Sequence, residues 1–171
     1  MVNCSVPQGV RILAGVYRAA GHLPTLGSLD ERLKLQREAY LLSMHPDLAE
    51  IRGLGFTMYV AGPYSPTLAR AYGQLECAAR DAPRPAPGAL VYAREILGMD
   101  PARLGAVALL AFLCEVVENT PRLGAADVRE SAMSMVVDAD VRAEVPQALE
   151  ALRDLAAHHG LRLPGPCAGG P

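Results

Sequence analysis

Acidic side chains in the C-terminal half stand at a spacing that could hold metal ions. Glu118 follows Glu115 by three positions, which places both carboxylates on one face of a helix. Glu130 follows Asp127 at the same spacing. A two-metal carboxylate site in a helical bundle also uses Glu-x-x-His pairs, and no His lies near these residues in the sequence. We therefore interpret both pairs as solvated surface and predict no metal site.

Other reactive side chains are scattered along the sequence. His158 and His159 are adjacent, so they point about 100° apart on a helix. Positive charge on them would interact favourably with the C-terminal end of the helix dipole. Ser43 and Ser65 have no His and Asp partners at a recognisable spacing, and the sequence holds no nucleophile-elbow, dinucleotide or phosphate-loop motif. The cysteines show neither C-x-x-C nor Cys/His spacing: Cys4, Cys77, Cys114 and Cys167. We predict no catalytic residue, no cofactor and no enzymatic activity.

The most specific feature is the stretch Gly62-Pro63-Tyr64-Ser65-Pro66. In an architectural interpretation, Gly62 and Pro63 fix a turn, and Ser65 caps a helix whose first position is Pro66. Tyr64 would then pack or hydrogen-bond across the junction. In a functional interpretation, the N–H groups at the start of that helix meet a phosphate or a carboxylate of a partner. Both interpretations stay open.

Basic side chains in the first half could contact nucleic acid. Arg70 and Gln74 are side-chain types that read base edges in the major groove. Phosphate contacts would come from five further residues: Arg32, Lys34, Arg37, Arg80 and Arg84. Up to Arg94 there are ten basic and seven acidic residues, a weaker excess than DNA-binding domains usually carry. The charge therefore permits a nucleic-acid contact without requiring one.

The elements around the motif set its position. We expect a strand at Phe56–Val60 and a helix at Ser65–Arg80, with an apolar face formed by Leu68, Tyr72, Leu75 and Ala79. The prolines and glycine of residues 81–88 argue against a helix there. A second strand is expected at Ala89–Tyr92, pairing with the first. The resulting two-stranded ribbon beside a third helix is typical of a winged-helix arrangement.

Helical periodicity and capping residues predict further helices on both sides. Two precede the motif, at about Val6–Ala20 and from the Ser28 capping box to Met44. A helix from Pro101 to Glu118 is apolar nearly all round and is expected to be the central buried element. Helices at Ala125–Asp138 and Pro146–His159 follow. On the second helix, four charged side chains are expected to face solvent or a partner: Arg32, Lys34, Arg37 and Glu38.

Length and composition favour one folded unit. The 171 residues are 51% hydrophobic and 20% charged, which suits a globular protein with a real core. We expect a winged-helix-like part at residues 1–97, C-terminal helices packed on it at 98–160, and a disordered tail at 161–171. The longest apolar run, Gly105–Cys114, is about half of a bilayer span. With no signal-peptide pattern at the N-terminus, we predict a cytoplasmic protein with no membrane contact.

The segment RLKLQREAYLL, followed by GFTMYVAGPYSPTLARAYGQL, resembles a group of poorly characterised prokaryotic proteins, the YwgA-like proteins. Their shared pattern is K-Q-K-x-x-Y-L-L, then F-x-x-Y-x-x-G-P-Y-S-x-x-L. The Panacea-type antitoxin domain, with its G-P-[VY]-x-P-x-[LV] stretch, is similar more distantly. The matching positions are Leu33, Leu35, Gln36, Tyr40, Leu41, Leu42, Phe56, Tyr59, Gly62, Pro63, Tyr64, Ser65 and Leu68.

This resemblance covers residues 10 to 80, and Arg37 stands where many relatives have Lys. It implies a small cytoplasmic protein, winged-helix-like or mostly helical, with a regulatory or unassigned role. It brings no catalytic residues with it.

The resulting hypothesis is a mainly α (α+β) protein with a winged-helix-like core, a two-stranded β ribbon and an appended C-terminal helical part. It would act as a regulator or adaptor through DNA or a protein partner. The alternative is a protein-interaction module, antitoxin-like or a homodimeric scaffold, without nucleic-acid affinity. A contiguous basic surface would favour DNA, an exposed apolar patch would favour a protein partner, and a deep pocket with perturbed titratable groups would favour an enzyme.

Overall fold

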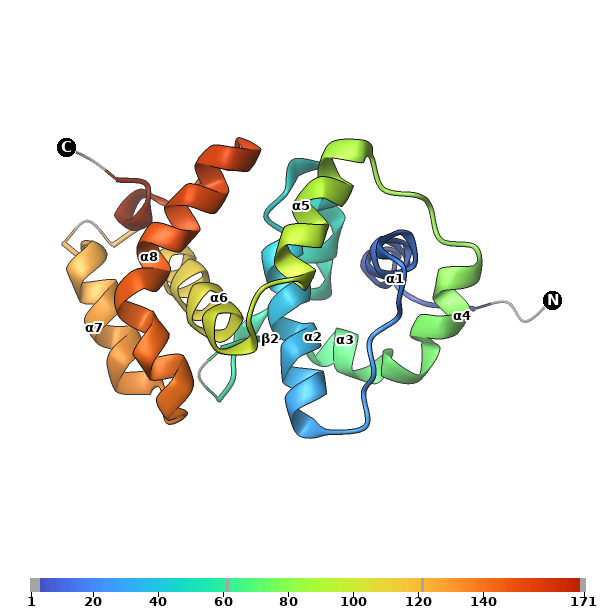
Figure 1. Cartoon of the computed structure of the whole chain (residues 1–171), viewed down its shortest axis with the longest axis horizontal. Coiled ribbons are helices and arrows are strands. Elements are labelled where there is room, and N and C mark those ends of the chain that lie inside the picture. Colours follow the sequence, from blue (N-terminus) through green and yellow to red (C-terminus); the bar gives the residue numbers. More distant parts are fainter. Residues whose placement is uncertain (1–3, 61, 121, 170–171) are drawn as a thin grey trace. The chain divides into compact units, whose positions relative to one another are not determined.

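A computed structural model of the chain describes residues 4–60, 62–120 and 122–169. These residues are mainly helical and include one two-stranded antiparallel sheet, which confirms the expected mainly α class (Figure 1). The chain forms two compact units. One comprises Met1–Thr57 and Tyr64–Gly98, and the other comprises Met58–Pro63 and Met99–Pro171. We call them the N-terminal and the C-terminal unit.

The N-terminal unit is built around α1, which Figure 1 shows nearly end-on. Helix α1 packs against the 3-10 helix η1 and against α4 and α5, while α2 packs against η1 and α5. The bounds are α1 Gln8–Ala20, α2 Leu29–Leu42, η1 Pro46–Leu54, α3 Pro66–Arg70, η2 Tyr72–Gln74, α4 Leu75–Arg80 and α5 Pro87–Leu97. The core is mostly aliphatic, with Leu13, Val16, Leu35, Leu41, Ile51, Leu68 and Ile96 buried.

Glycines determine how α1 ends and what lies against it. Gly21 follows the helix with φ of 100°, the left-handed conformation expected of a residue that closes a helix. Gly15 faces the segment between α4 and α5 so closely that a Cβ atom there would lie 2.3 Å from the carbonyl oxygen of Pro83. Only glycine permits this approach, so Gly15 fixes where the proline-rich segment crosses α1.

The C-terminal unit is organised around α6 (Pro101–Val116), as the sequence predicted. Asp100 caps this helix by accepting from the N–H of Ala102 at 3.0 Å and of Arg103 at 3.3 Å. Eleven consecutive residues, Leu104 to Cys114, are buried. Helix α6 packs against α7 (Ala125–Met135), α8 (Ala139–His159) and the 3-10 helix η3 (Gly165–Cys167).

The prediction that a strand at residues 56–60 pairs with a strand at residues 89–92 is wrong. The strands are β1 (Thr57–Met58) and β2 (Pro63–Tyr64), so the ribbon precedes α3. Residues 89–92 belong to α5, which begins at Pro87, because proline suits the first position of a helix. The buried residues of α5 follow the helical period: Ala89, Leu90, Tyr92, Ala93 and Ile96.

The single helix expected at Ser65–Arg80 is interrupted. Its first part is α3, its last part is α4, and the 3-10 helix η2 lies between them. Gly73 lies in η2, where the low helix propensity of glycine favours a break. Leu68, Leu75 and Ala79 are buried as expected, and Tyr72 is half-buried.

The start of the last helix and the tail also differ from the expectation. Helix α8 begins at Ala139 rather than near Pro146, because Asp138 caps it through the N–H groups of Asp140 and Val141. The expected disorder from residue 161 onward is wrong for the described part of the tail. Leu161, Leu163 and Cys167 are buried there, and η3 packs on α6 and α7. Residues 170 and 171 lie outside the described residues.

Candidate functional site

The Gly62–Pro66 motif is joined to α2 by one buried side chain, Gln36. Its Nε2 donates to the carbonyl oxygen of Ser65 at 3.1 Å, and its Oε1 accepts from the N–H of Ser65 at 2.7 Å. The Gln36 amide also donates to the hydroxyl of Tyr72 at 2.8 Å. A polar group buried this deeply is costly unless it is hydrogen-bonded, and all of these atoms are.

Ser65 is the N-cap of α3, as the sequence predicted. Its hydroxyl accepts from the N–H of Leu68 at 3.0 Å and donates to the carbonyl oxygen of Leu54 at 2.6 Å. Pro66 occupies the first helical position. Ser65 is buried, so these contacts are made away from solvent. The geometry favours the architectural interpretation of this part of the motif.

The residues expected to contact nucleic acid lie on several elements. Arg32 on α2 donates to the carbonyl oxygen of Leu26 at 2.9 Å, and Arg70 on α3 donates to the hydroxyl of Thr67 at 3.2 Å. Gln74 lies in η2, beyond the interruption of the helix. The continuous helix face that would have presented Arg70 and Gln74 together is therefore interrupted.

The remaining basic residues differ in their surroundings. Arg84 lines a hollow of about 350 Å³ together with Asp47 and Glu50 of η1. Arg80 is the last residue of α4, and its charge acts on the thiol of Cys4. Arg37 is half-buried on α2.

A pocket of about 260 Å³ lies between α1, α2 and the loop that joins them. Its lining residues are Tyr17, His22, Pro24, Thr25, Glu31, Lys34, Leu35 and Glu38. Glu38 was expected to face solvent, and this expectation is wrong, since Glu38 is 3% exposed. The hydroxyl of Tyr17 donates to Oε2 of Glu38, and Nζ of Lys34 lies 3.7 Å from Oε1 of the same carboxylate.

The pKa values of the two carboxyl groups of this pocket, Glu38 and Glu31, are shifted in opposite directions. Burial raises the pKa of Glu38, and the hydrogen bond from Tyr17 and the charge of Lys34 counteract only part of that increase. The hydroxyl of Thr25, which donates to Glu31 at 2.5 Å, and the N–H of Ser28 lower the pKa of Glu31. Opposed shifts in one pocket are a property of acid–base sites, although structural networks produce them too.

Tyr17 remains a hydrogen-bond donor in this pocket. Its burial, and then the neighbouring negative charge of Glu38, raise the pKa of the Tyr17 phenol well above its ordinary value. The phenol therefore keeps its proton across the physiological range and satisfies the buried carboxylate. Sequence spacing offers little sign of this pair, since Tyr17 and Glu38 lie on different helices. The Lys34–Glu38 spacing of i, i+4 was the one local indication.

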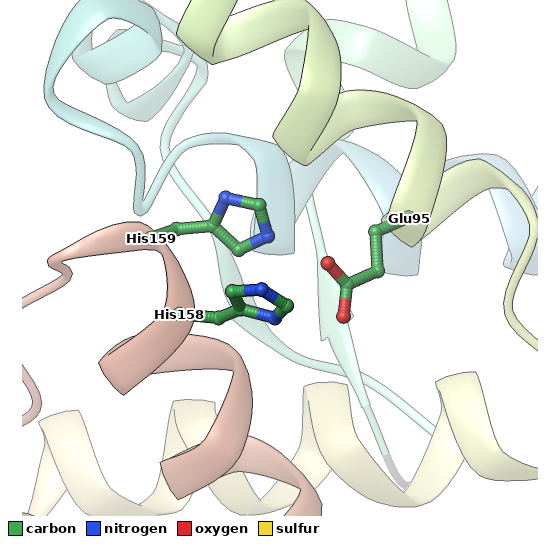
Figure 2. Close-up of side chains that lie close together, drawn as sticks. All are labelled: Glu95, His158 and His159. Carbon is green, nitrogen blue, oxygen red and sulfur yellow. The ribbon is translucent and has the colours of Figure 1, made fainter.

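His158 and His159 end α8. Figure 2 shows both rings projecting from the last turn of this helix, and Glu95 projecting from α5. The two imidazole centroids lie 5.3 Å apart with a tilt of 35°. Glu95 belongs to the N-terminal unit and the histidines belong to the C-terminal unit. We therefore assign no metal site to these three residues.

The cysteines are paired in space although they are distant in sequence. Cys114 of α6 forms a disulfide with Cys167 of η3, with their Cα atoms 5.9 Å apart. Cys4 and Cys77 are free thiols and half-buried. The spacing of the cysteines in the sequence indicated neither the disulfide nor which two thiols remain free. Because disulfides persist mainly in oxidising compartments, the cytoplasmic location stays a prediction.

Comparison with known proteins adds no identity. The chain matches no family model, no curated protein and no solved structure. Within the described residues, no single helix is both long and apolar enough to cross a membrane.

Proposed function

We propose that this chain is a small regulator or adaptor that binds a macromolecule through its N-terminal unit, and that nucleic acid is the favoured partner. The observation that carries this proposal is the exposure of eight arginines in that unit: Arg11, Arg18, Arg32, Arg52, Arg70, Arg80, Arg84 and Arg94. Arginine is well suited to bind phosphate because its guanidinium group can donate two parallel hydrogen bonds.

The charge of the unit supports this proposal. The N-terminal unit carries ten basic and eight acidic residues, and the burial of Glu38 withdraws one acidic group from its surface. The interrupted helix α3–η2–α4 favours contacts to the phosphate backbone over base reading by one helix in the major groove. A winged-helix-like arrangement, with the β1–β2 ribbon before α3, is part of the same proposal. The resemblance of its motif, which implies a regulatory or unassigned role, is consistent with this proposal.

Fluorescence anisotropy with random duplex DNA, at low and at moderate salt, tests the proposal. We expect binding that falls steeply with salt, and we expect Arg70→Ala and Arg84→Ala to weaken it. Each phosphate contact that is lost should lower the salt slope by about 1. Arg129→Ala is the matched control, because Arg129 is also exposed but lies on α7 of the C-terminal unit. An absence of binding even at about 50 mM salt would overturn the nucleic-acid reading.

A second candidate is a protein-interaction module, antitoxin-like or homodimeric. One observation favours it: the turn after β1 exposes Tyr59 by 52% and Val60 by 64%. Val60 also has φ of 40°, a conformation that β-branched residues rarely adopt and that is often associated with binding sites. Light scattering and pull-downs with Tyr59→Ala would test this candidate. Loss of a partner or of a dimer, with DNA binding unchanged, would favour it over the nucleic-acid proposal.

A further inference from the structure

The thiol of Cys4 lies at the start of α4, the helix that carries Cys77. The Cys4 thiol donates to the carbonyl oxygen of Gln74 at 3.7 Å. Gln74 directly precedes α4, and Cys77 is the third residue of that helix, three positions further on. Positions three apart lie on the same side of a helix, so this contact directs Cys4 toward Cys77.

The pair is accessible and lies near positive charge. Cys4 and Cys77 are both half-buried, so small reagents can reach them. The hydrogen bond with Cys77 raises the pKa of Cys4, and the nearby charges of Arg11 and Arg80 oppose this effect. Both cations would stabilise a thiolate once it forms, and they would attract an anionic reagent.

We propose that Cys4 and Cys77 are a redox-active dithiol that low-molecular-weight disulfides of the glutathione class oxidise to an intramolecular disulfide. Two free, half-buried thiols at the start of α4 differ from the buried Cys114–Cys167 pair, which is already joined. The new bond would tie the residues before α1 to α4, within the N-terminal unit.

The reaction is balanced by thiol–disulfide exchange. One protein thiol loses its proton, and the thiolate attacks a sulfur atom of the small disulfide. A mixed disulfide forms and one small thiolate leaves. The second protein thiolate then attacks the protein sulfur of the mixed disulfide and releases the second small thiol. The protein dithiol is oxidised by two electrons, the small disulfide is reduced to two thiols, and the two protons pass to the released thiolates.

The test uses the full chain incubated with oxidised glutathione, then alkylation and peptide mapping without reduction. We expect one peptide pair linked through Cys4 and Cys77, and two released glutathione thiols for each chain. Cys77→Ser and Cys4→Ser should instead retain glutathione on the remaining cysteine, at about tenfold or more above its level in the wild type, because the neighbouring thiol that displaces it is gone. The reaction should be faster at pH 8.5 than at pH 7, since the thiolate is the nucleophile.

Three outcomes would overturn the proposal: no reaction of the wild type, stable glutathione on both cysteines of the wild type, or a link from Cys4 or Cys77 to Cys114 or Cys167. The double variant Cys114→Ser/Cys167→Ser is the control for exchange with the existing disulfide, and it should still form the Cys4–Cys77 link. If that variant does not fold, the peptide map of the wild type decides the question alone.

Discussion

The side chain of Gln36 bonds to both backbone groups of Ser65, donating to its carbonyl oxygen at 3.1 Å and accepting from its N–H at 2.7 Å. The Gln36 amide thus makes to Ser65, the residue that caps α3, the pair of backbone hydrogen bonds that a neighbouring β-strand would make. Gln36 and Ser65 are 29 positions apart in sequence, and their hydrogen bonds hold α2 against the start of α3.

Replacing Gln36 should therefore destabilise the N-terminal unit strongly. Gln36→Met keeps the length of the side chain but leaves the N–H of Ser65 buried without its acceptor, while the carbonyl oxygen of Ser65 keeps only the bond from the N–H of Ala69 at 3.0 Å. We expect a loss of about 3 kcal/mol in the free energy of unfolding, measured with urea. Gln74→Met, at an exposed position, is the control and should change stability by about 0.5 kcal/mol or less. Equal effects of the two variants would contradict the role of Gln36.

Removing the hydroxyl of Tyr17 should cost more than removing that of Tyr92. Both are buried, but Tyr17 donates to the carboxylate of Glu38, whereas Tyr92 donates to the carbonyl oxygen of Leu41 at 2.5 Å. Hydrogen bonds to charged groups contribute about 1.5–3 kcal/mol, against about 1 kcal/mol for neutral pairs. Urea unfolding of Tyr17→Phe and Tyr92→Phe at neutral pH measures the difference. The reverse order would show that Glu38 is not ionised there.

The raised pKa of Glu38 predicts a specific pH dependence of stability. The folded chain holds this proton more tightly than the unfolded chain, so stability should fall as pH rises from the ordinary glutamate value of about 4.3 through the raised pKa. Glu38→Gln still offers Tyr17 an acceptor but carries no titrating proton. We expect a flatter profile for this variant in urea unfolding between about pH 4 and pH 7. Parallel profiles for the two proteins would contradict the assignment.

Gly15 should not tolerate a methyl group. A Cβ atom there would lie 2.3 Å from a backbone oxygen of Pro83, so the proline-rich segment would have to move. Gly15→Ala should destabilise the chain by about 1–3 kcal/mol, although alanine favours helices. Gly88→Ala is the matched control in α5, because nothing lies within 4 Å of its Cβ position. That variant should be neutral or stabilised by up to about 1 kcal/mol in thermal unfolding.

Local signals in the sequence predicted the starts of two helices. The capping box at Ser28 and the N-cap at Ser65 with Pro66 were both confirmed. Each depends on residues within a few positions of one another, so one sequence contains the whole signal. The continuous apolar run likewise identified α6 as the buried centre of its unit.

Long-range pairing could not be derived in the same way. Gln36 and Glu38 are polar residues on a helix, and polarity alone predicts exposure. Their burial depends on Ser65 and Tyr17, partners on other elements that sequence spacing does not reveal. Pro87 is a similar case. Proline is disfavoured in the interior of a helix but suits its first position, so a proline alone is an ambiguous signal. Among the described residues, the site was therefore less predictable than the secondary structure.

The disulfide between Cys114 and Cys167 makes a closed covalent loop that contains α7 and α8. A protease that cuts once inside this loop would leave both fragments attached to each other. The nicked protein would migrate as one chain until a reductant is added, and α8 would stay tethered near α6 after the cut. Cleavage in the loop before α7 would therefore leave the two ends of the unit linked as a single molecule.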